Sequence, residues 1–169
     1  MYWISICLKK AYTTYVRPIL EYASNVWNPY LLKHISGIER VQRRFTKRIP
    51  VLHDMSYSER LAALDLESLE IRRLRADLTL YYKILNNLVH ISRDLLPSAP
   101  PPPAVHTRSV APRLLRPKFT TFELDNNFFA RCVSCWNYLP DAVVNSSSVS
   151  CFKKNLSSVD LTLFLRYVS

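Results

Sequence analysis

Glycine is almost absent from this chain, whereas proline is common. The 169 residues contain one glycine, Gly37, and eleven prolines. Glycine-rich phosphate-binding loops are therefore excluded, and tight hairpin turns that depend on glycine are scarce. Both features favour helices joined by proline- and serine-rich connections. We therefore expect an all-α protein.

Long apolar runs and a cysteine framework are also missing. No apolar run reaches the roughly 18–20 residues of a membrane span, so we expect no membrane partner. The chain begins apolar and then becomes basic, the reverse of a secretory signal. The cysteines are too few for the disulfide framework of a secreted protein of this size. We therefore expect an intracellular protein, nuclear or cytoplasmic.

No constellation of catalytic or metal-binding residues stands out. Cys132 and Cys135 have the spacing of half a zinc site, but no second pair follows them. The four histidines show no recognisable arrangement with Cys, Ser or Asp, although a triad assembled in space stays open. We expect no catalytic residues, no metal, no cofactor and no small-molecule substrate.

The charge balance points to a polyanionic partner. The net charge is +10 and the pI is near 9.7, while 49% of the residues are hydrophobic. Such a chain can bury a core, and its excess of positive charge favours nucleic acid or another acidic surface as partner. The length corresponds to one domain or two small ones.

The strongest pattern lies in residues 30–49, where apolar residues recur at spacings of three and four. This predicts one long helix with a single apolar stripe. The stripe consists of Leu31, Ile35, Ile38, Val41, Phe45 and Ile49. Basic residues lie mostly off it, at Lys33, Arg40, Arg43, Arg44, Lys47 and Arg48. Glu39 is the only acid among them, and like charges one turn apart repel by about 0.2–0.5 kcal/mol per pair. This one-sided charge indicates an anionic partner, and a merely solvated basic face is the alternative.

The segment before this helix is rich in aromatic residues and is interrupted by Pro18. Either a helix from about Trp3 is kinked there, or a second helix starts with Pro18 in its first turn. The large side chains of the segment have helical spacing, at Tyr15, Ile19, Tyr22, Val26 and Trp27. Such residues can stack on bases, but packing is their commoner role, so we predict that they form core.

Two more helices are predicted before residue 95. Ser56 and Glu59 form a capping box that opens a helix through Leu64, and Ser68 leads a longer helix. The inward residues of the longer helix are Ile71, Leu74, Leu78, Tyr81 or Tyr82, Leu85 and Leu88. Its first half also holds Arg72, Arg73 and Arg75, where the helix dipole disfavours cations by about 0.3–1 kcal/mol each. These arginines suggest a second basic wall, with Asp77 as a candidate partner of Arg73.

The remainder divides into a linker and a short helical segment. Residues 96–105 read LPSAPPPPAV, and their prolines predict that they form neither helix nor strand. We expect a semi-rigid spacer here, and a ligand for a proline-binding domain is the weaker alternative. The following residues are basic, and together they give a Pro-rich linker at 96–118. In the last segment Phe129, Val133 and Trp136 form an apolar helical face that Pro140 ends.

Three blocks of this sequence resemble one family. The first block contains YVRPILEYAS, VWNP and IERVQRRFTK. The second has Tyr57, Arg60, Leu61, Leu66, Ser68, Leu69, Arg72, Arg73, Asp77 and Leu78. The third has Phe128, Phe129, Arg131, Trp136, Asn137, Leu139, Pro140, Asp141, Phe152 and Lys153. These residues resemble the thumb and post-thumb region of reverse transcriptases from LINE-type, jockey-like non-LTR retrotransposons. Ser109 stands where that family usually has a glycine, and the likeness fades beyond Asn155.

The resemblance implies a thumb that grips a primer–template, and a palm domain as a further partner. The Asp-Asp pair that holds two metal ions in a palm is absent from the chain, and we expect the palm to precede Met1, so polymerase activity does not carry over. We predict a thumb-like helical domain at 1–95, the linker at 96–118 and a C-terminal helical segment at 119–169.

The predicted partner is RNA–DNA hybrid or duplex nucleic acid, bound without sequence preference through phosphate. The residues assigned to this binding are Lys33, Arg40, Arg43, Arg44, Lys47, Arg48, Arg72, Arg73 and Arg75. The alternative is an inactive helical remnant, or a protein-interaction module whose exposed apolar surface a palm would cover.

Overall fold

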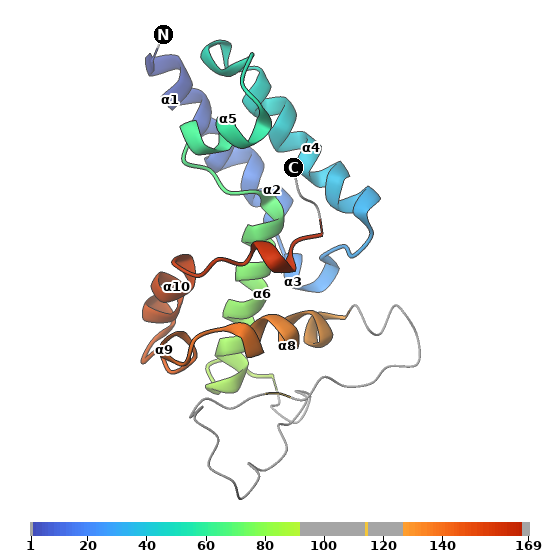
Figure 1. The fold of residues 1–169 in the computed structure, drawn as a ribbon, viewed down its shortest axis with the longest axis vertical. Helices are drawn as coiled ribbons and strands as arrows, with labels where there is room; N and C mark the ends of the chain where they lie inside the picture. The colour runs from blue at the N-terminus through green and yellow to red at the C-terminus, as the bar shows by residue number, and fades with distance from the viewer. Residues whose placement is uncertain (1, 92–113, 115–126, 167–169) are drawn as a thin grey trace, which may run out of the picture. The chain divides into compact units, whose positions relative to one another are not determined.

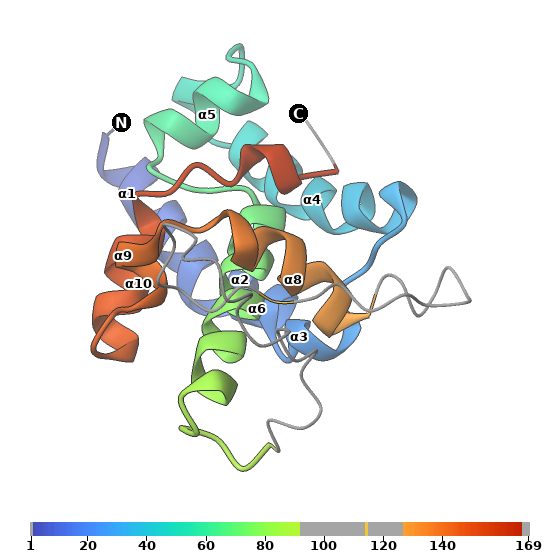
Figure 2. The same ribbon diagram turned by 60° about the horizontal axis from the view of Figure 1, so that its bottom comes forward.

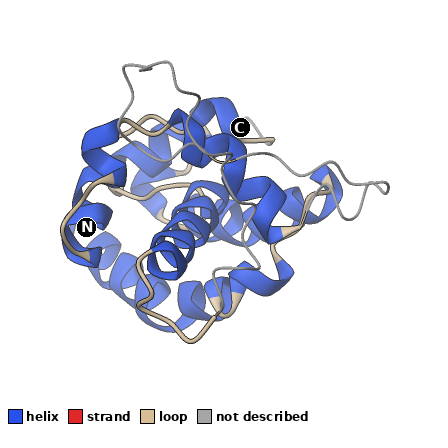
Figure 3. Cartoon of the chain, turned by 90° about the horizontal axis from the view of Figure 1, so that it is seen from below, coloured by secondary structure: helices blue, strands red, loops and turns tan. Residues whose placement is uncertain are grey.

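The computed structural model describes residues 2–91, 114 and 127–166. These residues form helices and turns without a strand, which confirms the all-α fold class (Figure 3). The chain divides into two compact units, Met1–Arg73 with Leu165–Ser169 and Leu74–Phe164. This division falls inside one helix, α6, whereas the predicted linker lies outside the described residues except for Leu114. The linker and the domain bounds drawn from it stay predictions.

The first unit begins with a helix that changes its winding before Pro18. The elements are α1 (Tyr2–Ala11), a π-helical turn (Tyr12–Val16), α2 (Arg17–Glu21) and α3 (Ser24–Trp27). Proline lacks a backbone N–H and collides with the carbonyl four residues earlier, so a wider turn relieves the clash. In that turn the Arg17 N–H bonds to the Tyr12 carbonyl. Both predicted alternatives hold in part, because the winding is interrupted and α2 has Pro18 in its first turn.

The same unit continues with α4 (Leu32–Lys47), a 3₁₀ turn (Pro50–Leu52) and α5 (Tyr57–Ala63), which Figure 1 labels. The predicted capping box of α5 is confirmed: the Ser56 hydroxyl accepts from the Glu59 N–H, and the Glu59 carboxylate accepts from the Ser56 N–H. A small core joins these elements and has Leu8 and Phe45 packed against it. It consists of Ile49, Leu52, Tyr57, Leu61, Leu64 and Leu66.

The aromatic segment before α4 is mostly outside this core. The prediction that it forms core is wrong, because Tyr15, Ile19, Tyr22 and Val26 are 73–86% exposed. Contact with α4 is made instead by Tyr12, which is buried and stacks on Phe45 with ring centroids 4.4 Å apart. The helical spacing of these residues therefore did not predict their burial, because the helix is broken after Glu21 and Ala23 has a left-handed backbone conformation.

The second unit packs the latter part of α6 (Leu69–Leu85) with the C-terminal helices. These are α8 (Phe128–Tyr138), α9 (Asp141–Val144) and α10 (Val149–Ser157), followed by a 3₁₀ turn (Thr162–Phe164), as Figures 1 and 2 show. Tyr81, Val133, Trp136 and Phe152 are buried in one apolar cluster, and Phe129 packs against it. This confirms the predicted apolar face of α8. The Arg131 guanidinium pairs with the buried Asp77 carboxylate at 3.2 Å.

Candidate nucleic-acid interface

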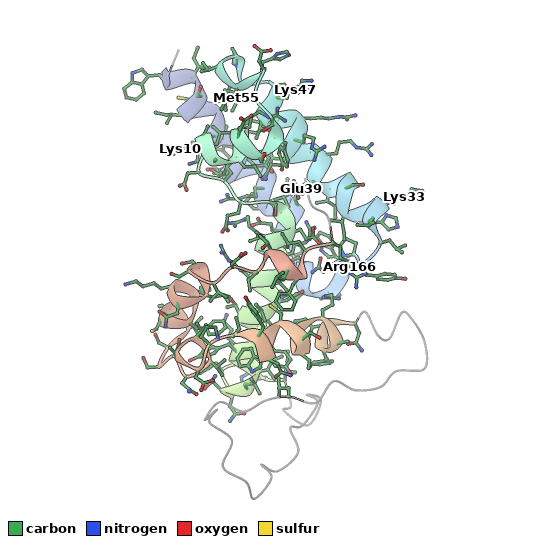
Figure 4. The ribbon with its side chains drawn as sticks, in the orientation of Figure 1. Lys10, Lys33, Glu39, Lys47, Met55 and Arg166 are labelled. Atoms are coloured by element: carbon green, nitrogen blue, oxygen red, sulfur yellow. The ribbon has the colours of Figure 1, made fainter. Side chains whose placement is uncertain are left out.

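The outer face of α4 carries a row of exposed cations. We call Lys33, Arg40, Arg44 and Lys47 the basic stripe; all four are exposed, as is Arg48 just beyond the helix. Their spacing of whole turns places the four on one face of the helix. Figure 4 shows Lys33 and Lys47 on the outer side of α4 and Glu39 on the inner side. The sequence prediction that these side chains are solvent-facing is confirmed.

The inner face of α4 differs from the predicted apolar stripe. The buried positions are Ile35, Glu39, Gln42 and Thr46, so three of the four are polar or charged. Val41, predicted to be core, is 39% exposed. The helix is rotated relative to the apolar pattern because these polar groups find buried partners on other elements.

A chain of hydrogen bonds connects the buried polar groups. The Tyr12 hydroxyl donates to Gln42 Oε1 at 2.9 Å. Gln42 Nε2 donates to the Glu67 carbonyl at 2.9 Å and to the Tyr57 hydroxyl at 3.1 Å, and that hydroxyl donates to Glu39 Oε1. A buried polar group left without a partner costs about 1–3 kcal/mol, so the network strongly favours this one rotational setting of α4. In this setting the basic stripe faces outward.

Glu39 also caps the first turn of α6. Its Oε2 accepts from the Leu69 N–H at 3.0 Å, and Leu69 is the first residue of that helix. A carboxylate there meets an otherwise unpaired N–H and the positive end of the helix dipole. Burial raises the pKa of the Glu39 carboxyl, and the hydrogen bonds from Tyr57 and Leu69 oppose that rise. Sequence reasoning counted Glu39 only as a lone acid. Ile35, Glu39, Gln42 and Thr46 are spaced by four, three and four residues, so they share one face of the helix. This spacing was the sign in the sequence that Glu39 points inward with Ile35.

Arg43 lies at the border between the two faces of α4. Its guanidinium stacks over the Tyr57 ring, 4.8 Å from the centroid, and the residue is half-buried. Arg60 lies on the same ring at 5.6 Å and donates to the Thr46 hydroxyl at 3.1 Å. Arg43 therefore helps to hold α5 against α4, so it is not an exposed member of the basic stripe.

The three arginines of α6 do not form the second basic wall that the sequence suggested. Arg72 makes an ion pair with Glu21, and the hydrogen bond from this pair raises the pKa of the Arg72 guanidinium. Arg73 is 1% exposed and donates to Asn28 Oδ1 at 3.0 Å. Arg75 is half-buried and donates to the Ser157 carbonyl at 3.3 Å. Acceptors far along the chain draw these cations inward, where they fix neighbouring segments of their own units.

The two cysteines of α8 lie in an apolar core, which fits a structural role. Cys132 and Cys135 are buried in the core of the second unit. Burial raises the pKa of Cys135 to about 12 and holds that of Cys132 well above its ordinary value, so neither readily forms a thiolate. Within the described ranges, no three His, Cys, Asp or Glu residues gather as metal ligands. Every helix found in residues 2–91 and 127–166 is too short or too polar to cross a bilayer.

A comparison with curated proteins finds a relative of this chain. An uncharacterized protein of Caenorhabditis elegans is 29% identical over 118 residues, which are 68% of this chain. The chain spans 56% of the length of that relative. No family model matches the chain, and no solved structure matches it.

Proposed function

We propose that this chain is a non-catalytic nucleic-acid-binding fragment of a retrotransposon RNA-directed DNA polymerase. It binds the phosphate backbone of RNA–DNA hybrid or duplex without sequence preference. The observation that supports this proposal is the basic stripe of α4, where four exposed cations share a face and the only carboxylate of the helix is turned inward.

Charge on such a face acts mainly through phosphate. Each phosphate neutralised by Lys or Arg releases condensed counterions, so affinity falls with salt by a slope of about −0.9 per contact on duplex. This salt dependence requires no contact with the bases, and we assign no residue to such a contact. The proposal assigns no polymerase activity to the chain, since the sequence holds no Asp-Asp pair.

The test is a salt titration of binding to an RNA–DNA hybrid oligonucleotide. We expect the triple variant Arg40→Gln, Arg44→Gln and Lys47→Gln to flatten the slope of log affinity against log salt by about 2–3 units. The fold should persist, because all three side chains are exposed.

A second triple variant controls for net charge. Lys10→Gln, Lys153→Gln and Lys154→Gln removes the same charge from exposed positions on α1 and α10. We expect this variant to keep nearly the full slope of the parent. Equal slopes for the two triple variants would show that overall charge, and not the basic stripe, governs binding, and the proposal would fail.

Exposed aromatic and apolar residues of the first unit favour a second candidate function. Trp3, Tyr15, Ile19 and Tyr22 are each at least 73% exposed, on α1, on the π-helical turn, on α2 and just after it. A protein-interaction module would pack such residues against another polypeptide, and in a sample of the pure protein that polypeptide is a second copy of the chain. Sedimentation over a concentration series should then show association that Ile19→Asp abolishes. A monomer at all concentrations would count against this candidate.

A further inference from the structure

The single glycine of the chain lies in the middle of the basic stripe. Gly37 is exposed on α4, one turn after Lys33 and one turn before Arg40. It interrupts a face on which the neighbouring whole-turn positions carry long cationic side chains.

The fold itself gives no reason for glycine at this position. In the described part of the chain no glycine has a positive φ, so an L side chain meets no backbone strain there. A Cβ built on Gly37 has nothing within 4 Å, so no neighbouring element requires the missing side chain. Glycine is also the least favourable residue in a helix interior after proline. Helix stability alone would favour almost any other residue.

We infer that Gly37 is the point at which the bound nucleic-acid backbone comes closest to α4. This inference rests on the proposed function. With no side chain at position 37, a sugar–phosphate segment can lie directly against the helix backbone. Charge complementarity indicates that the molecule bound here is a nucleic acid, since the flanking cations attract phosphate and would repel a basic partner.

The neighbours of Gly37 fit this role. Long side chains on a helix lean toward its N-terminus, so Arg40 is directed over the turn that contains Gly37. Arg44 lies one turn further along and leans toward Arg40, whereas Lys33 lies one turn before Gly37 and leans away from it. A phosphate at the bare position would therefore lie against Arg40, and a methyl group there would push the phosphate away from that cation.

The experiment compares stability and binding in the same variants. Gly37→Ala and Gly37→Leu should raise the midpoint of thermal unfolding by about 2–4 °C, because both residues favour helix more than glycine does. The same variants should weaken binding to the RNA–DNA hybrid by about tenfold, as expected for one lost charge-assisted contact. A gain in stability with a loss of affinity is the signature of a ligand-contacting glycine.

Ser36→Ala is the matched control. It changes the adjacent residue of the same helix to a better helix former, but it removes atoms instead of adding them. We expect its hybrid affinity to stay within about twofold of the parent, a change well below one lost contact.

The outcomes separate this inference from the proposed function. Gly37 variants that bind like the parent, while the Arg40, Arg44 and Lys47 triple variant loses salt slope, would overturn the inference alone. A parent that does not bind the hybrid would overturn both. Equal weakening by Ser36→Ala would assign the effect to the helix and not to position 37, and would also overturn the inference.

Discussion

Replacing Glu39 by alanine tests whether the buried polar network holds α4 in place. Glu39 is 1% exposed and accepts hydrogen bonds from the Tyr57 hydroxyl and the Leu69 N–H. Alanine has no side-chain oxygen that could accept either of these hydrogen bonds. Both donors would remain in a buried setting, since Tyr57 is 8% exposed and Leu69 is fully buried.

The expected loss of stability follows from these two donors. Each donor left unpaired in the interior costs about 1–3 kcal/mol, and the removed side chain also leaves a cavity. Relief of the desolvated carboxylate offsets part of this loss. We therefore expect Glu39→Ala to lower the free energy of unfolding by about 2–4 kcal/mol at pH 7.

The assay is urea unfolding followed by circular dichroism and by tryptophan fluorescence. Arg40→Ala is the control, because it changes the next residue of α4 at an exposed position and should change stability by less than about 0.5 kcal/mol. If Glu39→Ala were no more destabilising than Arg40→Ala, the inward position of Glu39 and the network built on it would be refuted.

Two further predictions concern the same helix. Burial raises the folded-state pKa of Glu39 above its ordinary 4.5, so the native state holds the proton more tightly than the unfolded state and stability falls as pH rises through the folded pKa. Glu39→Gln does not titrate, so urea unfolding from about pH 4 to 8 should show the variant gaining on the parent as pH rises, and a constant difference would contradict this. Phe45→Ala should cost about 2–3 kcal/mol through its stacking on Tyr12, whereas Val41→Ala should cost less than about 1 kcal/mol because Val41 is 39% exposed. If Val41→Ala lowered the free energy of unfolding as much as Phe45→Ala, Val41 would be buried as the sequence pattern predicted.

Features set by nearby residues were predictable from the sequence. The capping box of α5 needs only Ser56 and Glu59, three residues apart, and both of its hydrogen bonds form. The start of α6 after Ser68 is equally local, since the Ser68 hydroxyl accepts from the Ile71 N–H at 3.3 Å. The exposure of the basic stripe follows from helical spacing and the cost of burying unpaired cations.

Features set by distant partners were not predictable. Gln42 is buried because Tyr12, Tyr57 and the Glu67 carbonyl meet it, and no local pattern announces that meeting. Arg73 turned inward for the same reason, toward Asn28. A hydrophobicity pattern treats such polar residues as surface, so it found Ile35 and Phe45 on the packed side of α4, and Ile49 just after it, but missed Glu39, Gln42 and Thr46 beside them, and it left three arginines of α6 on the outside.

The inward position of Glu39 has a consequence for how quickly a polyanion arrives. With its only carboxylate buried, α4 presents a field of one sign to the solvent. Such a field attracts an approaching polyanion before contact and raises the association rate, within a range of about 8–10 Å at ordinary salt. The residue that caps α6 thereby also shapes the encounter, because an outward carboxylate would have cancelled part of that attraction at the centre of the helix.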